Sequence, residues 1–363
     1  MSSTVTPPPT TQGEGRPGGS QGGFSTQRRT PTGLLIALGI VALALGGLFI
    51  LVTPVNDVWT FVIITGLVLA VLYGIAAFAF EGGRKGKDRL VTTLVWVSFA
   101  VAFTPLALVL GYTIWKGLER FDLEFFTTTM RNIRPTQDGG GALHAIVGTI
   151  EQVMIAAAIS VPLGIMTAIY LVEYGKGRLA TTIRFFTDVM TGVPSIVAGL
   201  FIYAAFVLGL GIGFSGFAAS LALTILMLPT VVRSTEEMLK LVPDTLREAS
   251  YALGVPKYRT ILRIVLPTAL TGIVTGVMLA IARIAGETAP LLLTSFGNPN
   301  MNANPFDGPQ ESLPIFVYFQ ATNPQQTAVA RAWTGALVLI ILVMSLNVVA
   351  RWLASRNDLM KTG

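Results

Sequence analysis

The stretch 244-DTLREASYALGVPKYRTILRIVLP-267 predicts two short helices joined by a tight turn, with an apolar span following them. Gly254 permits a positive φ, and the residue before Pro256 is biased away from the helical region, so we expect the turn at Gly254–Pro256. Asp244 is a residue type that caps helices, and Pro267 marks the start of the span. Such a unit is predicted either to lie on the membrane surface or to dock on a cytoplasmic partner.

The composition around this stretch is that of a membrane protein. Of the 363 residues, 52% are hydrophobic and 12% are charged, whereas a soluble domain has about 25% charged residues. The chain has no Cys and one His, His144. This excludes disulfides, thiolate zinc sites and paired-His metal sites, and we predict no metal site and no catalytic residue. The net charge of +6 is interpreted as a signal of membrane orientation, not of nucleic-acid binding.

Eight segments reach or approach the ~20 apolar residues that a bilayer span requires. The sixth is short and contains Pro229, but the charge pattern of the loops fails without it. The predicted spans are approximately Leu34–Val52, Val58–Phe80, Leu90–Trp115, Ile146–Val172, Phe185–Leu210, Phe217–Val232, Ala269–Ser295 and Trp333–Ala350.

Basic residues orient these spans, because cytoplasmic loops carry an excess of Lys and Arg. Most of the 25 Lys and Arg residues fall in the two terminal tails and in the segments Glu81–Arg89, Glu173–Arg184 and Arg233–Thr268. The long segments Lys116–Leu143 and Phe296–Ala332 hold few. We therefore predict an all-α membrane protein with eight spans and both termini in the cytoplasm.

The opening stretch resembles the signature loop of ABC-importer permeases. In that family, Glu-Ala-Ala is followed after three residues by Gly and after nine more by Ile-x-Leu-Pro. This chain matches the pattern at Glu248, Ala249, Gly254, Ile264, Leu266 and Pro267, with Ser250 in place of the second Ala. The resemblance implies that this loop holds a coupling helix that docks in a groove of a separate ATP-binding subunit.

A second informative stretch is 283-RIAGETAPL-291, inside the seventh predicted span. A charged residue at mid-bilayer costs ~2.5–3.5 kcal/mol on insertion scales, so it needs a partner or a wet cavity. On a continuous helix Arg283 and Glu287 share a face and can neutralise each other, and Gly272 and Gly276 would admit a close helix neighbour. Either this is a structural ion pair, or Arg283 meets a permeating anion, since a guanidinium fork suits phosphate.

This second stretch resembles the PstA-type phosphate permease family, as do Asp122–Phe126, Tyr170–Gly177 and Gly192–Leu200. The resemblance extends over about Leu90–Leu353 and implies a six-span permease core. The implied partners are a PstC-type permease, a PstB-type ATPase dimer and a PstS-type extracytoplasmic phosphate-binding protein.

The expected organisation has four parts. Residues 1–32, rich in Pro, Gly, Ser, Thr and Gln, form a disordered cytoplasmic tail. Residues 33–89 add a two-span hairpin and a basic loop that the typical family member lacks. Residues 90–355 form the permease domain, with the cytoplasmic coupling loop at 233–268, and residues 356–363 form the C-terminal tail.

Three further residues are assigned to the pathway with structural alternatives left open. Pro194 and Ser195 either unwind the fifth span or merely kink it. Arg233 either binds the anion on exit or snorkels to the interface. Asp188 is expected to be interfacial, and no partner is evident for Glu151.

No phosphate-binding loop occurs; the nearest approach, Gly82–Asp88, has the wrong spacing. The chain is therefore predicted to bind no cofactor itself, with ATP and Mg²⁺ used by the partner ATPase. We expect a multi-pass permease of the cytoplasmic (inner) membrane that imports inorganic phosphate. The alternatives are an ABC permease for molybdate or sulfate, a secondary transporter driven by an ion gradient, and an intramembrane enzyme.

Overall fold

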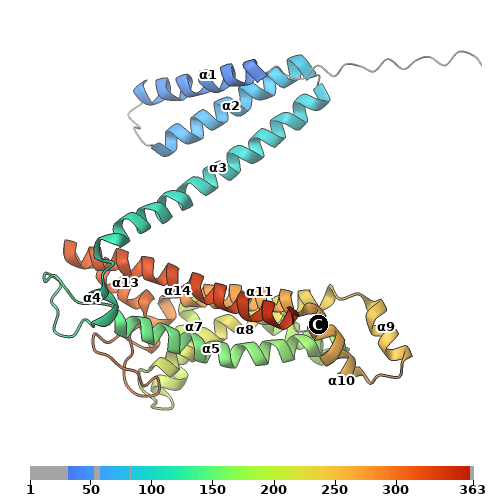
Figure 1. Cartoon of the computed structure of the whole chain (residues 1–363), viewed down its shortest axis with the longest axis vertical. Helices are drawn as coiled ribbons and strands as arrows, with labels where there is room; N and C mark the ends of the chain where they lie inside the picture. The colour runs from blue at the N-terminus through green and yellow to red at the C-terminus, as the bar shows by residue number, and fades with distance from the viewer. Residues whose placement is uncertain (1–31, 53–57, 82, 360–363) are drawn as a thin grey trace, which may run out of the picture. The chain divides into compact units, whose positions relative to one another are not determined.

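The computed structural model describes residues 32–52, 58–81 and 83–359, and it contains two compact units that divide after Leu108. Both units are helical (Figure 1). The all-α class is therefore confirmed. The predicted disordered tail, apart from Thr32, and residues 360–363 of the predicted C-terminal tail lie outside the described residues.

The first unit is a small helical assembly of α1 (Thr32–Val52), α2 (Val58–Glu81) and the N-terminal part of α3 (Gly83–Gly117). Glycines allow close helix contacts: a Cβ at Gly46 would lie 2.0 Å from the Thr65 hydroxyl oxygen, and one at Gly74 would lie 2.4 Å from Leu90. Two helices thus occupy the positions predicted for the extra hairpin.

The second unit holds the remaining helices and the C-terminal part of α3. Their bounds are α4 (Leu123–Thr127), α5 (Leu143–Ile169), α6 (Arg178–Thr191), α7 (Ser195–Ile202), α8 (Gly216–Lys240), α9 (Asp244–Ala252), α10 (Lys257–Thr260), α11 (Leu266–Ala285), α12 (Ala289–Thr294), α13 (Leu313–Ala321) and α14 (Gln326–Leu359). Three turns of π-helix occur among these helices. The turn at Tyr170–Tyr174 extends α5, the turn at Tyr203–Leu208 extends α7, and the turn at Ile261–Val265 joins α10 to α11.

The core of the second unit forms where α5 and α11 pack on α8. Gly164 of α5 lies against Val231, where an added Cβ would come within 2.7 Å of the Val231 side chain. Gly272 and Gly276 of α11 lie against Met238 and Ser234 of α8. The predicted close approach along the small-residue face of α11 is therefore confirmed, and its neighbour is α8.

Among the described residues, five helices are long and apolar enough to cross a membrane, or six if the bent pair α6–α7 is one span. The chain is thus a multi-pass membrane protein. The apolar parts of α1 and α2, Ile36–Phe49 and Thr60–Ala76, fall short of this length test. The eight-span count and the cytoplasmic position of the termini remain predictions.

Two predicted spans are not continuous helices, which corrects the sequence interpretation. The predicted fifth span, Phe185–Leu210, consists of α6 and α7, which meet at 106°. The predicted seventh span, Ala269–Ser295, consists of α11 and α12, which are separated at Gly286–Thr288. Pro194 is the cap residue of α7, and Pro290 lies in the first turn of α12, where its missing N–H costs no helical hydrogen bond.

Candidate functional site

The predicted helix–turn–helix is present as α9 and α10, which lie at one end of the second unit, while α4 lies at the other (Figure 1). Gly254 has a φ of +74° and forms the expected turn. The prediction that Asp244 caps α9 is wrong, because Pro243 occupies the cap position and Asp244 is the first helical residue. Its carboxylate instead accepts a hydrogen bond of 3.1 Å from Arg247.

Arg247 anchors α9 to the membrane-spanning helices. Its guanidinium donates to the Glu173 carboxylate at 3.1 Å, and to the carbonyls of Leu239 at 2.9 Å and Val242 at 2.6 Å. Glu173 is buried in the π-helical turn that ends α5, and its carbonyl accepts a hydrogen bond from Lys257 of α10. Both helices, α9 and α10, are therefore tied to the same turn.

The departure of Ser250 from the signature motif has a structural consequence. The Ser250 hydroxyl hydrogen-bonds to the Thr260 hydroxyl at 2.8 Å, and both side chains are buried between α9 and α10. The buried position has room only for a small residue. Ser250 fits there and adds a hydrogen bond that joins α9 to α10 across the turn.

The remaining motif residues divide between an outer face and the base of α11. Glu248 and Ala249 are exposed, whereas Ile264, Leu266 and Pro267 are half-buried where the helix enters the core. Large apolar side chains accompany Glu248 on the outer surface: Leu246, Tyr251, Leu253 and Tyr258 are exposed, and Leu253 retains 83% of its accessible area. An exposed apolar face with one acidic residue is typical of a docking surface.

The Arg283–Leu291 stretch does not form the predicted ion pair. Within residues 83–359, no hydrogen bond or ion pair joins Arg283 and Glu287. Arg283 lies in the last turn of α11 and is exposed, and Glu287 follows the helix end. The i,i+4 interpretation is therefore wrong, since Gly286 ends the helix.

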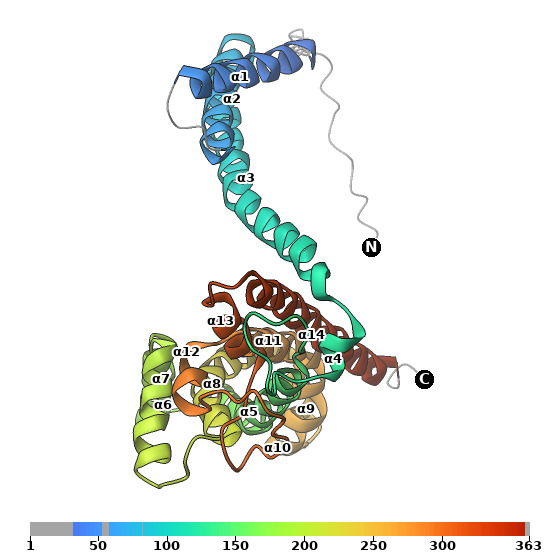
Figure 2. The ribbon, with the colours of Figure 1, turned by 90° about the vertical axis from the view of Figure 1, so that its left-hand side faces the viewer.

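The helices that follow the two breaks, α7 and α12, pack against each other. Figure 2 shows α12 beside α7. Gly199 of α7 contacts α12 so closely that an added Cβ would lie 2.6 Å from the Pro290 Cα. Pro194 precedes α7 in an extended conformation, with ψ of 140°, and Ser195 is the first helical residue. Of the two alternatives for Pro194 and Ser195, the structure has an interrupted helix, not a kink in a continuous one.

Arg233 lies in a separate, mixed-charge cavity between α6 and α8. It donates to the Asp188 carboxylate at 2.5 Å, and Glu236 pairs with Arg184 at 3.3 Å and with Lys240 at 2.8 Å. The cavity has a volume of about 420 Å³. It is lined by Leu171, Arg184, Thr187, Asp188, Arg233, Glu236 and Lys240. Asp188 is thus a partner of Arg233, which the sequence did not indicate.

The segment 296–312, predicted to be extramembrane, folds back into the helices. Gln310 is buried and donates to the Glu151 carboxylate at 2.6 Å, while its amide oxygen accepts from Gln152 at 3.0 Å. Glu151 therefore has a partner, 159 residues away in the chain.

Arg331, fully buried in α14, donates to the carbonyls of Gln137 at 2.8 Å and Pro135 at 3.2 Å. It joins the two long segments predicted to lie outside.

Residues 160–358 match the family of binding-protein-dependent transport system inner membrane components. The chain belongs to this family. Its relatives include PstA 1, a phosphate transport system permease protein of Mycobacterium tuberculosis (strain ATCC 25618 / H37Rv), which is 48% identical over 280 residues, covering 76% of this chain and 90% of the relative. The PstA protein of Yersinia pestis is 43% identical over 272 residues, covering 75% of this chain and 91% of the relative. The predicted membership of the PstA-type group is confirmed.

Among solved structures, an inward-facing MetNI methionine ABC transporter chain aligns with a TM-score of 0.46 and 19% identity. The alignment covers 60% of this chain and 94% of that chain. The family's PstA members are transport components, and the permease assignment follows from the sequence relationship.

Proposed function

We propose that this chain is the membrane subunit of an ATP-driven importer of inorganic phosphate and forms half of the translocation pathway. The observation that carries the proposal is the 48% identity to a PstA phosphate permease over 76% of the chain. The Arg283–Leu291 stretch lies within the matched family region, residues 160–358. A PstC-type permease would supply the other half of the pathway.

Coupling to ATP is assigned to α9 and α10. Leu246, Tyr251 and Leu253 give an apolar face that a groove on a PstB-type ATPase can bury, with Glu248 beside it. Arg247 and Lys257 then transmit a displacement of these helices to Glu173 and α5. ATP and Mg²⁺ belong to that partner, and the chain itself binds no cofactor.

The substrate pathway is assigned to the two interrupted helices. Arg283 is exposed and makes no ion pair with Glu287, so its five donors are available to a phosphate oxyanion. Pro194 and Ser195 place backbone groups at the neighbouring break, where irregular backbone lines a cavity in membrane proteins. Arg233, with its partner Asp188, is assigned to the exit side.

The orientation follows from this assignment. The end with α9 and α10 faces the cytoplasm, together with both termini, in a multi-pass protein of the cytoplasmic membrane. The joined segments around Arg331 face outward and receive a PstS-type phosphate-binding protein. We retain residues 1–32 as a tail, 33–89 as the added hairpin, and 90–355 as the permease domain with its coupling loop at 233–268.

The test is ATPase activity of the complete complex, reconstituted with its binding protein and supplied in turn with phosphate, molybdate and sulfate. We expect stimulation by phosphate alone. Stimulation by molybdate or sulfate, with none by phosphate, would make the chain a permease for another oxyanion. Phosphate uptake driven by an ion gradient without an ATPase would contradict the proposal and favour a secondary transporter.

A further inference from the structure

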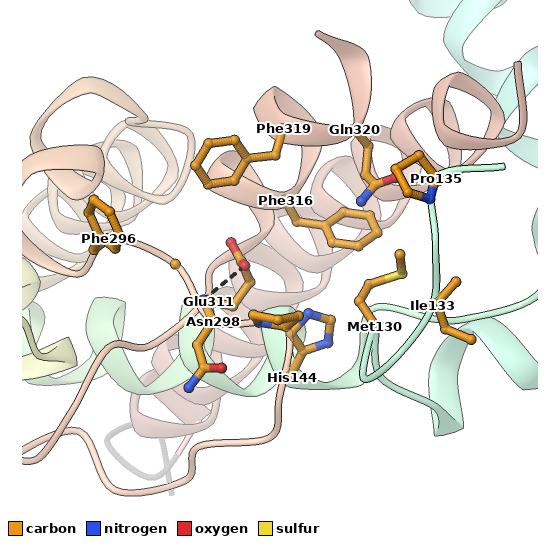
Figure 3. Close-up of a pocket in the computed structure, with 12 residues that line it drawn as sticks. Met130, Ile133, Pro135, His144, Phe296, Asn298, Glu311, Phe316, Phe319 and Gln320 are labelled. Atoms are coloured by element: carbon orange, nitrogen blue, oxygen red, sulfur yellow. Dashed lines mark hydrogen bonds between the residues drawn. The ribbon is translucent and has the colours of Figure 1, made fainter. Parts of the chain in front are cut away.

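A second cavity lies in the second unit and has a volume of about 340 Å³ (Figure 3). Its lining includes neither Arg283 nor any residue of α9 or α10. Its walls come from the segments 130–135 and 296–299, the start of α5, and α13. The lining residues are Met130, Ile133, Pro135, His144, Phe296, Gly297, Asn298, Pro299, Glu311, Phe316, Phe319 and Gln320.

Two polar side chains in this cavity carry buried atoms without a hydrogen-bond partner. Glu311 is 7% exposed, and its Oε2 accepts from the Asn298 backbone N–H at 3.1 Å while its Oε1 has no hydrogen-bond partner. His144 is 1% exposed, and neither of its ring nitrogens has one. Buried polar atoms are normally satisfied, so unpartnered atoms in a cavity point to a missing partner.

The Glu311 carboxylate is held in place by its surroundings. Gly148 of α5 lets the Glu311 backbone approach so closely that an added Cβ would lie 2.0 Å from its carbonyl oxygen. Gly297, with a φ of +79°, packs against the carboxylate, where an added Cβ would lie 3.2 Å from Oε2. Two residues on, the Leu313 N–H donates to Thr149 at 2.7 Å. The acid is therefore fixed on a rigid support.

Aromatic rings complete the cavity. Phe316 is buried and meets His144 edge to face at 6.0 Å between ring centroids, while Phe296 and Phe319 are exposed. Aromatic faces attract ammonium groups, and the attraction strengthens where water is excluded. The residues lining this cavity include no Lys or Arg, so its chemistry suits a cation and disfavours an anion.

We propose that this cavity binds a protonated primary amine, whose ammonium group pairs with Glu311 while its alkyl part packs on Phe296, Phe316 and Phe319. The amine is either a lysine side chain of an extracytoplasmic polypeptide or a free alkylamine. This site does not depend on the assignment of phosphate as the transported substrate.

The proposal has a pH signature. Burial raises the pKa of Glu311 to about 8, so the carboxylate is mainly neutral at pH 7 and mainly charged at pH 9. A primary ammonium, with a pKa near ~10.4, stays protonated over this range. Amine binding therefore tightens as the pH rises through 8. His144 of α5 is the titratable residue in the lining besides Glu311. The buried Arg331 of α14 lies behind the lining and donates to Gln320 at 3.1 Å and to the Pro135 carbonyl at 3.2 Å.

The test uses the complete complex in lipid nanodiscs, labelled with ¹³C-methyl methionine. Met130 lines the cavity, and its signal is assigned with Met130→Leu. We expect n-butylammonium to shift this signal saturably, with binding that is tighter at pH 9 than at pH 7 by up to roughly tenfold. The neutral analogue 1-butanol should bind at least tenfold more weakly. Glu311→Gln should abolish the pH dependence, and Asp307→Asn, an exposed change on the same segment, should preserve it.

Equal binding of 1-butanol and n-butylammonium to the wild-type complex, or no response of Met130, would overturn the proposal even if Glu311→Gln fails to fold. A competition arm separates the two sources. If the extracytoplasmic binding protein blocks the n-butylammonium shift and its lysine-acetylated form does not, the natural occupant is a lysine side chain. If n-butylammonium binds and neither form competes, the occupant is a free amine.

Discussion

Two charged motifs in this chain behave in opposite ways. In the coupling segment, Arg247 makes an ion pair with Glu173 and hydrogen bonds to two carbonyls. In the Arg283–Leu291 stretch, Arg283 and Glu287 are one helical turn apart in sequence, yet they do not bind each other in this structure.

The difference distinguishes charged residues that stabilise the fold from charged residues whose hydrogen-bond donors are available to a ligand. Arg247 is largely buried, and its donors are used within the chain, so it holds α9 against the end of α5. Arg283 is exposed at the end of α11, beside a break in the helix, so its donors remain available. A charged residue is costly in lipid, so an arginine that its own chain does not neutralise indicates a functional position.

A large effect on subunit binding is predicted at the outer face of α9 and α10. Leu253→Asp should weaken binding of the ATPase subunit by about 2–4 kcal/mol, or roughly 30- to 1000-fold, because it puts a charge into an apolar docking face. Co-purification of the tagged ATPase measures the effect. The matched control is Leu123→Asp on α4, which is equally exposed at the other end of the unit. Equal loss in both variants would contradict a docking role.

The next effect is at the anchor. Arg247→Ala leaves the buried Glu173 carboxylate without its cation, which costs about 3–5 kcal/mol for a buried pair. We expect faster hydrogen exchange in residues 244–260 and ATP hydrolysis that no longer drives uptake. Arg263→Ala, at an exposed position nearby, should leave both unchanged. Unaltered exchange in Arg247→Ala would show that the network does not hold α9.

A smaller effect tests the missing ion pair directly. Because no bond joins Arg283 and Glu287, their double-mutant coupling energy should be under about 0.5 kcal/mol, as for independent sites. The cycle of Arg283→Gln, Glu287→Gln and the double variant is measured by thermal unfolding of the complex in nanodiscs. A coupling of 1 kcal/mol or more, in the range of contacting residues, would restore the ion pair.

The smallest effect is at Ser250. Ser250→Ala removes one buried hydrogen bond to Thr260 and should lower the stability of the α9–α10 turn by about 1 kcal/mol. Hydrogen exchange at residues 250–260 measures it. Ala249→Ser, at the adjacent exposed position, serves as the control. If both changes leave exchange equal, the hydroxyl pair contributes nothing.

Local chemistry explains which features the sequence predicted. The turn at Gly254 and the close-packing face at Gly272 and Gly276 depend on residue size and backbone freedom, which are properties of the residues themselves. Hydropathy likewise predicts apolar length. It does not distinguish a continuous helix from two helices that meet at Pro194, because both bury the same apolar residues.

Contacts between distant residues could not be predicted in this way. Glu151 and Gln310 are 159 positions apart, and Glu173 and Arg247 are 74 apart. Nothing in the sequence around Arg331 distinguishes it from a charged residue of a loop, but its side chain is completely buried in the structure. Burial of such groups depends on how the helices pack, which a single sequence does not specify.

The account depends most directly on Arg283. The decisive measurement compares phosphate uptake and ATP hydrolysis in the same proteoliposomes for wild type, Arg283→Gln and Arg131→Gln, the last being an exposed arginine outside the proposed pathway. We predict that the Arg283→Gln complex assembles normally but that its uptake falls by roughly 10- to 150-fold, since a charge-assisted pair is worth about 1.5–3 kcal/mol. Arg131→Gln should transport like wild type. Full uptake by an assembled Arg283→Gln complex would contradict the account.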